Sequence, residues 1–234
     1  MTAKMLEINK IYCMDAIEFL KQIPDNSVDL VLTDPPYNAS NSNVEMVDLH
    51  WKSNSEEWDK KFKIDFMYDI KRILKGGGSC LVFCSHHILR QYLNYNDLKL
   101  QQILHWIQDN PIPALMKVYT FNVQYILWYV KKGKPYTFNK RFAKTNVIKT
   151  MKDKGFKRYH PCQKSCSIIR PLIQVHSNES DLVLDCFMGS GTTAVVSKQL
   201  KRNYIGCDFS EEYCKMAEKR IEEQVQPLDL RFYK

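Results

Sequence analysis

Short apolar runs alternate with segments of helical periodicity along this chain. The runs that we expect to form strands are brief, rich in strand-forming residues and bounded by turn-forming residues. They span 28–33, 79–84, 103–107, 123–130, 182–185 and 204–208. Helical spacing predicts helices over 56–74, 165–176, 192–200 and 210–224, and Gly76, Gly77 and Gly78 are expected to end the first of them. This alternation predicts an α/β fold, in which a single doubly wound, mostly parallel sheet carries helices on both faces.

The size of the chain and the distribution of its charge narrow the functional classes. The 234 residues fit one domain, so we expect residues 1–234 to form a single domain. A formal charge of +8 favours an acidic partner such as nucleic acid or an anionic membrane surface. Eleven basic residues against one acid give residues 131–158 a charge of +10, so the rest of the chain carries −2.

No apolar run approaches the roughly 20 residues that a membrane helix needs. The first seven residues also lack the apolar core of a signal peptide, so no membrane partner and a cytoplasmic location are expected. The eight cysteines are interpreted as reduced thiols that pack as small hydrophobic residues. Cys80 and Cys84, like Cys162 and Cys166, are four residues apart, which raises the alternative of a zinc site. Zinc knuckles usually have the spacing C-x2-C, so no metal site is predicted.

A glycine loop, residues 185–193, joins a predicted strand to a predicted helix. Glycines let the backbone turn tightly and approach a ligand, and the start of the helix points N–H groups at the same place. The next strand ends at Asp208, whose carboxylate can accept hydrogen bonds from both ribose hydroxyls. Because no lysine follows Gly191, the loop favours a nucleoside over a phosphate-rich ligand. A tight turn that binds nothing is the alternative.

A second polar segment, Asp34-Pro35-Pro36-Tyr37, follows the first predicted strand. The two prolines fix the backbone. A carboxylate and a rigid carbonyl can together accept both hydrogens of an amino group, which prepares the nitrogen lone pair for attack. The tyrosine that follows can stack on a planar base. An inert Pro-Pro turn at the end of a strand is the alternative.

Together the two segments resemble the motifs of an amino-group DNA methyltransferase, Asp-Pro-Pro-Tyr for catalysis and Phe-x-Gly-x-Gly for the cofactor. The order, with the catalytic motif first, the basic insert between and Phe187-Met188-Gly189-Ser190-Gly191 last, resembles the β group of that family. Residues 160–164 resemble its His-Pro-x-x-Lys-Pro motif, although Ser165 stands in the place of the last proline. Asp208 replaces the more frequent glutamate and keeps its charge. The resemblance covers nearly the whole chain, and the segment 131–158 matches least.

The resemblance implies a Rossmann-like methyltransferase fold, S-adenosylmethionine as cofactor, and transfer of its methyl group to the exocyclic N6 of adenine in a base flipped out of DNA. An aspartate at the first position of the catalytic motif favours adenine in this family. The implied catalytic residues are Asp34, Pro35, Pro36 and Tyr37. The implied cofactor-binding residues are Asp15, Lys164, Asp185, Phe187, Gly189, Ser190, Gly191, Thr192 and Asp208. The alternatives are cytosine N4 in DNA, an amino group in RNA, and a DNA-binding module whose cofactor pocket is not catalytic.

The basic segment 131–158 is predicted to be a small DNA-recognition insert that binds phosphates of double-stranded DNA. The residues expected to contact DNA are Lys140, Arg141, Lys144, Lys149, Lys157 and Arg158. Asn139 and Asn146 are candidates for reading adenine edges. A solvated charged surface is the alternative. A homodimer and a cognate restriction nuclease are further hypotheses about partners.

Overall fold

The computed structural model describes residues 6–36, 63–108, 119, 122–150 and 163–224. Its elements, in chain order, are β1 (Lys10–Cys13), α1 (Ala16–Gln22), β2 (Val28–Thr33), α2 (Phe66–Ile73), β3 (Leu74–Cys84), α3 (Leu89–Leu93), β4 (Lys99–Gln108), β5 (Val123–Val130), the 3-10 turn η2 (Lys140–Phe142), β6 (Val147–Thr150), α4 (Cys166–His176), β7 (Leu182–Asp185), α5 (Thr192–Gln199), β8 (Asn203–Asp208) and α6 (Glu211–Glu223).

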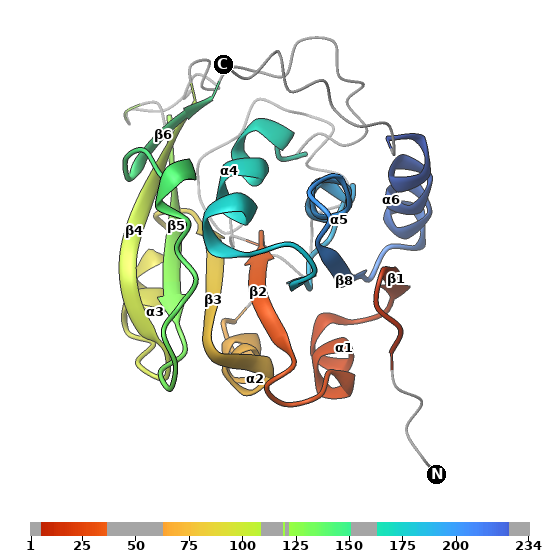
Figure 1. The fold of residues 1–234 in the computed structure, drawn as a ribbon, viewed down its shortest axis with the longest axis horizontal. Helices are drawn as coiled ribbons and strands as arrows, with labels where there is room; N and C mark the ends of the chain where they lie inside the picture. Colours follow the sequence, from red (N-terminus) through yellow and green to blue (C-terminus); the bar gives the residue numbers. More distant parts are fainter. Residues whose placement is uncertain (1–5, 37–62, 109–118, 120–121, 151–162, 225–234) are drawn as a thin grey trace.

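The strands form one sheet in the order β1-β8-β7-β2-β3-β5-β4-β6 (Figure 1). β5 pairs antiparallel with both of its neighbours, β3 and β4, and every other pairing among these strands is parallel. The mostly parallel sheet predicted from the sequence is therefore confirmed. Because the remaining strands run in one direction, their carboxyl ends meet at the same edge of the sheet, which is where ligands bind in such folds.

The strands alternate their side chains between two apolar layers, as the two-residue period of a strand requires. In β2, Val31 packs into the layer that includes residues of α1 and α2, whereas Leu30 and Leu32 pack into the layer that includes α4. Figure 1 shows α1 and α2 on one side of the sheet and α4 and α5 on the other. Both faces are covered by helices, as predicted, and this burial is the main source of stability for the sheet.

The predicted strands 28–33, 123–130 and 182–185 have the bounds of β2, β5 and β7, and those predicted at 79–84, 103–107 and 204–208 lie within β3, β4 and β8. Three of the predicted helices also correspond closely to α4, α5 and α6, and Ser165 and Ser210 cap two of them. β1, α1, α3 and β6 were not predicted. Their apolar patterns are short, with four to seven residues each, and short runs carry little periodicity.

The prediction that Gly76, Gly77 and Gly78 end a helix is wrong. Within the described residues, the helix predicted at 56–74 spans Phe66–Ile73, and the glycines lie in β3. Gly77 has φ +82°, and a Cβ on it would lie 2.5 Å from the carbonyl oxygen of Pro135. The glycines therefore let the segment after β5 cross close to β3, a demand of the tertiary structure that the local sequence does not reveal.

No helix in the described part of the chain is long and apolar enough to cross a membrane. Seven cysteines fall within the described residues, and all of them are free thiols. Cys80 and Cys84 are buried in the apolar layer that includes α1 and α2. In the same described ranges, no three histidine, cysteine or acidic side chains are placed to hold a metal ion.

Gly206 in β8 is expected to tolerate no side chain. A Cβ there would lie 2.1 Å from Met188 Cε and 2.3 Å from the carbonyl oxygen of Asp185, and backbone cannot yield as a side-chain tip can. We expect Gly206→Ala to lower the free energy of unfolding by about 1–3 kcal/mol, measured by urea denaturation. Gly76→Ala is the control, because its Cβ would meet its nearest atoms at 3.6 Å or more, and we expect a change within about 0.5 kcal/mol. Equal losses in the two variants would contradict this account.

Candidate active site

Four aspartates lie side by side at the carboxyl edge of the sheet. Asp208 and Asp185 end the adjacent strands β8 and β7, and Asp34 directly follows the next strand, β2. Asp15 lies two residues beyond β1, on the other side of β8. Neighbouring strands are about 4.8 Å apart, so this order gathers acidic groups along a short stretch of one edge.

The glycine loop connects β7 to α5 at this edge. Gly191 has φ +78°, and a Cβ there would lie 2.7 Å from Cβ of Ala217, so this glycine allows α6 to pack closely. Gly189 has φ +50°, and a Cβ there would meet no atom within 4 Å. Gly191 therefore serves packing, whereas Gly189 borders open space at the start of α5, where a ligand can approach the backbone.

Asp208 is fixed by the loop that it faces. Its Oδ2 accepts a hydrogen bond from Gly189 N at 2.8 Å, and its Oδ1 accepts one from Ser210 N at 3.0 Å. These two hydrogen bonds hold the carboxylate in a fixed orientation at the end of β8. Asp15 is exposed and caps α1, since its Oδ1 accepts from Ile17 N and Glu18 N.

Asp185 is buried beneath the loop, although the sequence resemblance placed it among the residues that contact the cofactor. Its Oδ1 accepts hydrogen bonds from Thr33 Oγ1 at 2.7 Å and Phe187 N at 3.1 Å. Burial raises the pKa of Asp185 to about 6, against the opposing effect of these hydrogen bonds and one from Thr193. This carboxyl group ties the glycine loop to β2, one residue before Asp34.

Asp34 is paired with Lys164, which lies just before α4. The side chain of Lys164 is 11% exposed and that of Asp34 is 24% exposed, so the pair is mostly enclosed but Asp34 remains accessible. Lys164 Nζ also lies 5.2 Å from the ring centroid of Phe83 and 5.9 Å from that of Trp106. Pro35 is buried and Pro36 half-buried behind Asp34, and Tyr37 lies outside the described residues.

The other predicted loop residues support the site from within. Phe187 is half-buried and packs edge-on against Phe66, with ring centroids 5.3 Å apart. Ser190 and Thr192 are both buried, and their hydroxyl oxygens accept hydrogen bonds from Arg220. The sequence reasoning did not single out Arg220. The sequence could have indicated that Arg220 is buried, because it lies on the same face of α6 as Ala217 and Ile221, which pack in the core.

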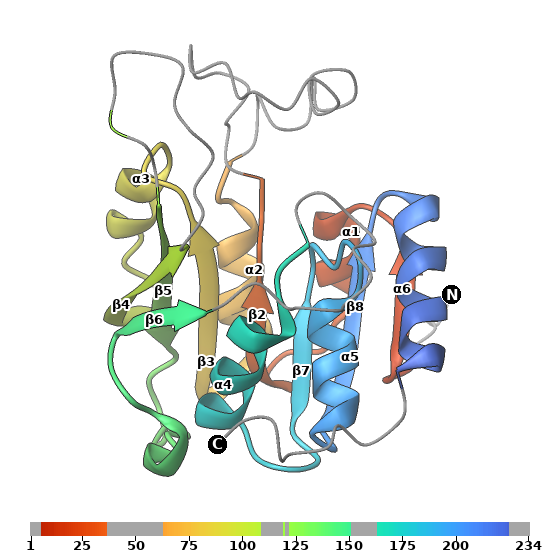
Figure 2. The same ribbon diagram turned by 90° about the horizontal axis from the view of Figure 1, so that it is seen from above.

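The predicted DNA-contacting residues are divided between the two edges of the sheet. Lys140 and Arg141 lie in η2, and the adjacent Asn139 donates to the carbonyl oxygens of Gln174 and Ser177 at the carboxyl end of α4. α4 begins beside Lys164 and is about 16 Å long, so η2 lies at the opposite edge from Asp34. In Figure 2 the green segment before β6 likewise lies at the other end of the sheet from the arrowhead of β2. Asn139 therefore caps a helix at the edge away from Asp34.

Lys149 lies in β6, which pairs with the carboxyl-terminal part of β4. The next residue, Thr150, accepts a hydrogen bond from Trp106 Nε1 at 2.9 Å, and the Trp106 ring lies beside Lys164. The structure thus brings Lys149 to the Asp34 edge. Lys144 and Asn146 are exposed in the segment between η2 and β6, and Lys157 and Arg158 lie outside the described residues.

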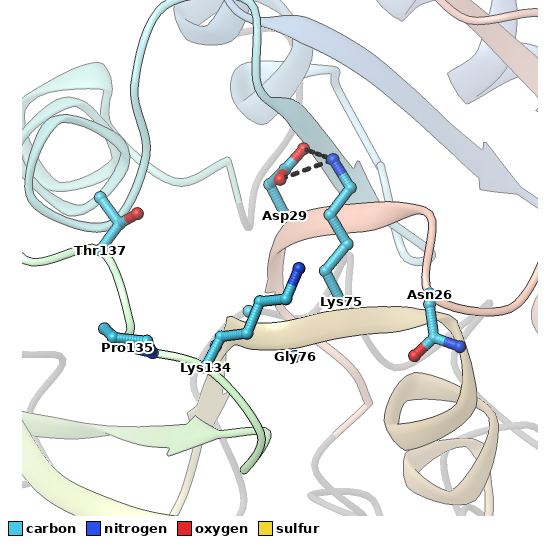
Figure 3. A pocket seen from close by; sticks show the side chains of 9 residues that line it. Asn26, Asp29, Lys75, Gly76, Lys134, Pro135 and Thr137 are labelled. Atoms are coloured by element: carbon cyan, nitrogen blue, oxygen red, sulfur yellow. Dashed lines mark hydrogen bonds and ion pairs between the residues drawn. The ribbon is translucent and has the colours of Figure 1, made fainter.

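A separate pocket of about 490 Å³ opens at the edge away from Asp34 (Figure 3). It is lined by residues 76–78 of β3, by Asp29 and Lys75, which form an ion pair, and by Lys134. Figure 3 shows the Lys134 side chain extending toward that ion pair. Its place at the amino ends of β2 and β3 separates this pocket from the carboxylates at the other edge.

The chain is similar to known proteins along most of its length. The model of a family described as DNA methylase matches residues 28–219, which include Asp34, the glycine loop and Asp208. The chain belongs to the DNA methylase family. Type II methyltransferase M2.MboI from Moraxella bovis is 30% identical over 238 residues, which cover 91% of this chain and 87% of that protein.

Solved structures place this DNA methylase in the same fold. The crystal structure of the M1.HpyAVI–SAM complex matches with a TM-score of 0.68 and 28% identity, and the match covers 90% of this chain and 98% of the other. The PvuII DNA methyltransferase, which is cytosine-N4-specific, matches with a TM-score of 0.71 at 20% identity over 92% of this chain and 90% of the other, a likeness of fold alone. The predicted Rossmann-like methyltransferase fold is thereby confirmed.

The raised pKa of Asp185 makes the stability of this DNA methylase depend on pH. The pKa is about 6 in the folded state and close to its ordinary value of 3.8 in the unfolded chain. Between these values the folded state binds the extra proton, so this group's contribution to stability is lost as pH rises toward 6 and above. Asp185→Asn keeps an oxygen that can accept from Thr33 and Phe187 and cannot ionise. We expect its free energy of unfolding, relative to the wild type, to rise as the pH of urea denaturation increases from 4 to 7. A difference that stays constant over this range would contradict the assignment.

Proposed function

We propose that this DNA methylase transfers a methyl group from S-adenosylmethionine to the exocyclic N6 amino group of adenine in DNA. The observation that carries the proposal is the accessible carboxylate of Asp34, which is paired with Lys164. Asp34 lies beside the glycine loop and two strands away from Asp208. The order of the two motifs along the chain supports a place in the β group of the family.

The residues at the carboxyl edge fit S-adenosylmethionine. Gly189 leaves open space where a side chain would stand, and Asp208 is preorganised with lone pairs that ribose hydroxyls can use. Asp15, exposed beyond β1, resembles the family position that contacts the adenine of the cofactor. When bound, S-adenosylmethionine supplies a methyl group on a positively charged sulfur, and a cluster of carboxylates favours such a cation.

Asp34 acts on the acceptor in this proposal. An exocyclic amine is a poor nucleophile because its lone pair is conjugated into the ring. The Asp34 carboxylate accepts one amino hydrogen, and the rigid backbone of Pro35 provides a carbonyl for the other. A carboxylate offers about four lone-pair positions, so it can hold an ion pair and accept a hydrogen bond from an amino group at the same time. The residues contribute positioning and electrostatics, and no covalent bond to the enzyme is required.

DNA binding is proposed to use the edge that carries Asp34. Lys149 lies on this edge, and the residues that follow it in the predicted insert include Lys157 and Arg158. The target base must leave the duplex to reach Asp34, and Tyr37 is proposed to stack on it. From the type II designation of the relatives we also propose a cognate restriction nuclease, and a homodimer stays a prediction.

Asp34→Ala and Asp34→Asn test the proposed reaction. Loss of the charged acceptor should lower methyl transfer by at least about 100-fold, because aligned proton acceptors contribute on this scale. The measurement uses S-adenosylmethionine with a labelled methyl group and unmethylated genomic DNA, followed by identification of the modified base. Calorimetric binding of S-adenosylhomocysteine serves as the control for an intact cofactor pocket. Turnover of Asp34→Ala near the wild-type value would refute the role of Asp34, and N4-methylcytosine as product would replace adenine with cytosine.

Lys149→Gln and Lys140→Gln test which edge meets DNA. Each variant removes one positive charge from the predicted insert, but the two lysines lie at different edges of the sheet. We expect Lys149→Gln to weaken DNA binding and to reduce the slope of log K against log salt by about 0.9, the value for one phosphate contact. Lys140→Gln should leave the slope nearly unchanged. Fluorescence anisotropy with a labelled duplex, at salt concentrations from about 50 to about 200 mM, gives both slopes. An equal decrease in slope for Lys140→Gln would contradict the proposal.

A further inference from the structure

Arg220 is a fully buried arginine in α6, with 0% of its surface exposed. Its Nη1 donates to Ser190 O at 3.0 Å, to Ser190 Oγ at 3.2 Å and to Thr192 Oγ1 at 2.9 Å. Its Nη2 lies 3.6 Å from Cys166 Sγ, at the start of α4. The guanidinium group thus touches both the glycine loop and the helix that follows Lys164.

The hydrogen bonds around Thr192 have only one consistent direction. Arginine has donors and no acceptor, so Thr192 Oγ1 must accept from Arg220. A carbonyl oxygen can only accept, so the single hydroxyl proton of Thr192 must go to Lys164 O, which lies 3.0 Å away. Thr192 therefore links the buried Arg220 to the backbone of Lys164, whose side chain pairs with Asp34.

The last link of this chain of contacts is the ion pair between Lys164 and Asp34. The side chain of Lys164 can reach Asp34 in this geometry only while its backbone is held at the start of α4. Thr192 O–H holds the carbonyl oxygen of Lys164, and Arg220 contacts the side chain of Cys166 two residues further along. A displacement of about 1 Å near the reacting groups can cost on the order of 100-fold in rate.

We propose that Arg220 is a positioning residue for methyl transfer. Through Thr192 and Lys164 it sets the position of the Asp34 carboxylate, and through Ser190 it sets the shape of the glycine loop. The first of these links is called the lysine arm, and the second the loop arm. The proposal rests on the proposed function for its turnover readout, but the contacts themselves can be tested without catalysis.

A role in packing alone would have different consequences. A side chain that only fills space can usually be replaced by an apolar side chain of similar volume at little cost in stability. If Arg220 only filled space between α5 and α6, Arg220→Met would change neither the turnover of the folded enzyme nor the mobility of residues 163–168. The lysine arm predicts that both change, whatever happens to the melting temperature.

The sharpest test replaces Thr192 by valine, which keeps the shape and removes the hydroxyl. We expect Thr192→Val to lower kcat at saturating S-adenosylmethionine by about 10-fold or more, with the Kd for S-adenosylhomocysteine within about threefold of the wild type. Thr192→Ser, which keeps the hydroxyl, should restore most of the lost turnover. Arg220→Met should affect both quantities, because it removes both arms.

Ser197→Ala is the matched control. Ser197 is a buried residue of α5, whose hydroxyl donates to Thr193 O at 2.7 Å and takes no part in either arm. It should cost some stability and leave kcat unchanged. Hydrogen exchange of the peptide 163–168 supplies a readout without catalysis, and we expect faster exchange in Thr192→Val and Arg220→Met but not in Ser197→Ala.

The outcomes separate this proposal from the proposed function. If the wild-type protein binds the cofactor but methylates no DNA, the proposed function is refuted. The hydrogen-exchange data would still test the lysine arm. Wild-type exchange in Thr192→Val, or an unchanged kcat in that variant, would overturn the positioning role. A Kd for S-adenosylhomocysteine that rises in Thr192→Val by the same factor as kcat falls would also overturn it. The hydroxyl would then contribute to the cofactor pocket in general.

Discussion

The arrangement of the whole site depends on holding several carboxylates close together at the carboxyl edge of one mostly parallel sheet. Each of them is stabilised differently. Asp208 accepts two backbone N–H groups, Asp15 lies at the positive end of α1, and Asp34 is paired with Lys164. Asp185 is the most buried of the four, and the loss of solvation of its charged form raises its pKa. Like charges at such spacing repel, so the loops and helices that supply these donors are constrained by the acids that they surround.

The donors come from segments that are far apart in sequence, and this explains the folding of the glycine loop. Thr33 and Phe187 both bind Asp185, so the loop after β7 is aligned with the end of β2. Gly189 then presents its N–H to Asp208 and leaves open space on its other side. A side chain at Gly189 would enter the open space at the start of α5, and one at Gly191 would push α6 away. The two glycines of this motif are therefore required for different reasons, Gly189 for open space beside the loop and Gly191 for close packing of α6.

Much of the fold and of the site could be predicted from the sequence, for identifiable reasons. β2 and β7 are buried on both faces, so they read as continuous apolar runs bounded by turns, and the polar motifs that follow them are placed by the strand ends. The glycines at 76–78 were misread because their purpose is a close approach of residues from beyond β5, which local sequence does not encode. The capping role of Asn139, whose amide donates to α4 from 35 residues away, is likewise not encoded in the local sequence.

The basic insert shows the limit of charge as a guide. Its net charge is a property of the sequence, but its path takes Lys140 to one edge of the sheet and Lys149 to the other. Burial is a better guide once the structure is known. Arg220 adds nothing to a surface charge pattern, since it is enclosed, yet its positive charge lies directly behind the glycine loop. Its guanidinium group holds Ser190 and Thr192 by hydrogen bonds, and Thr192 in turn donates to the carbonyl oxygen of Lys164, the partner of Asp34. Arg220 and Lys164 therefore act on the acidic edge from within, which a lysine of the exposed insert cannot do.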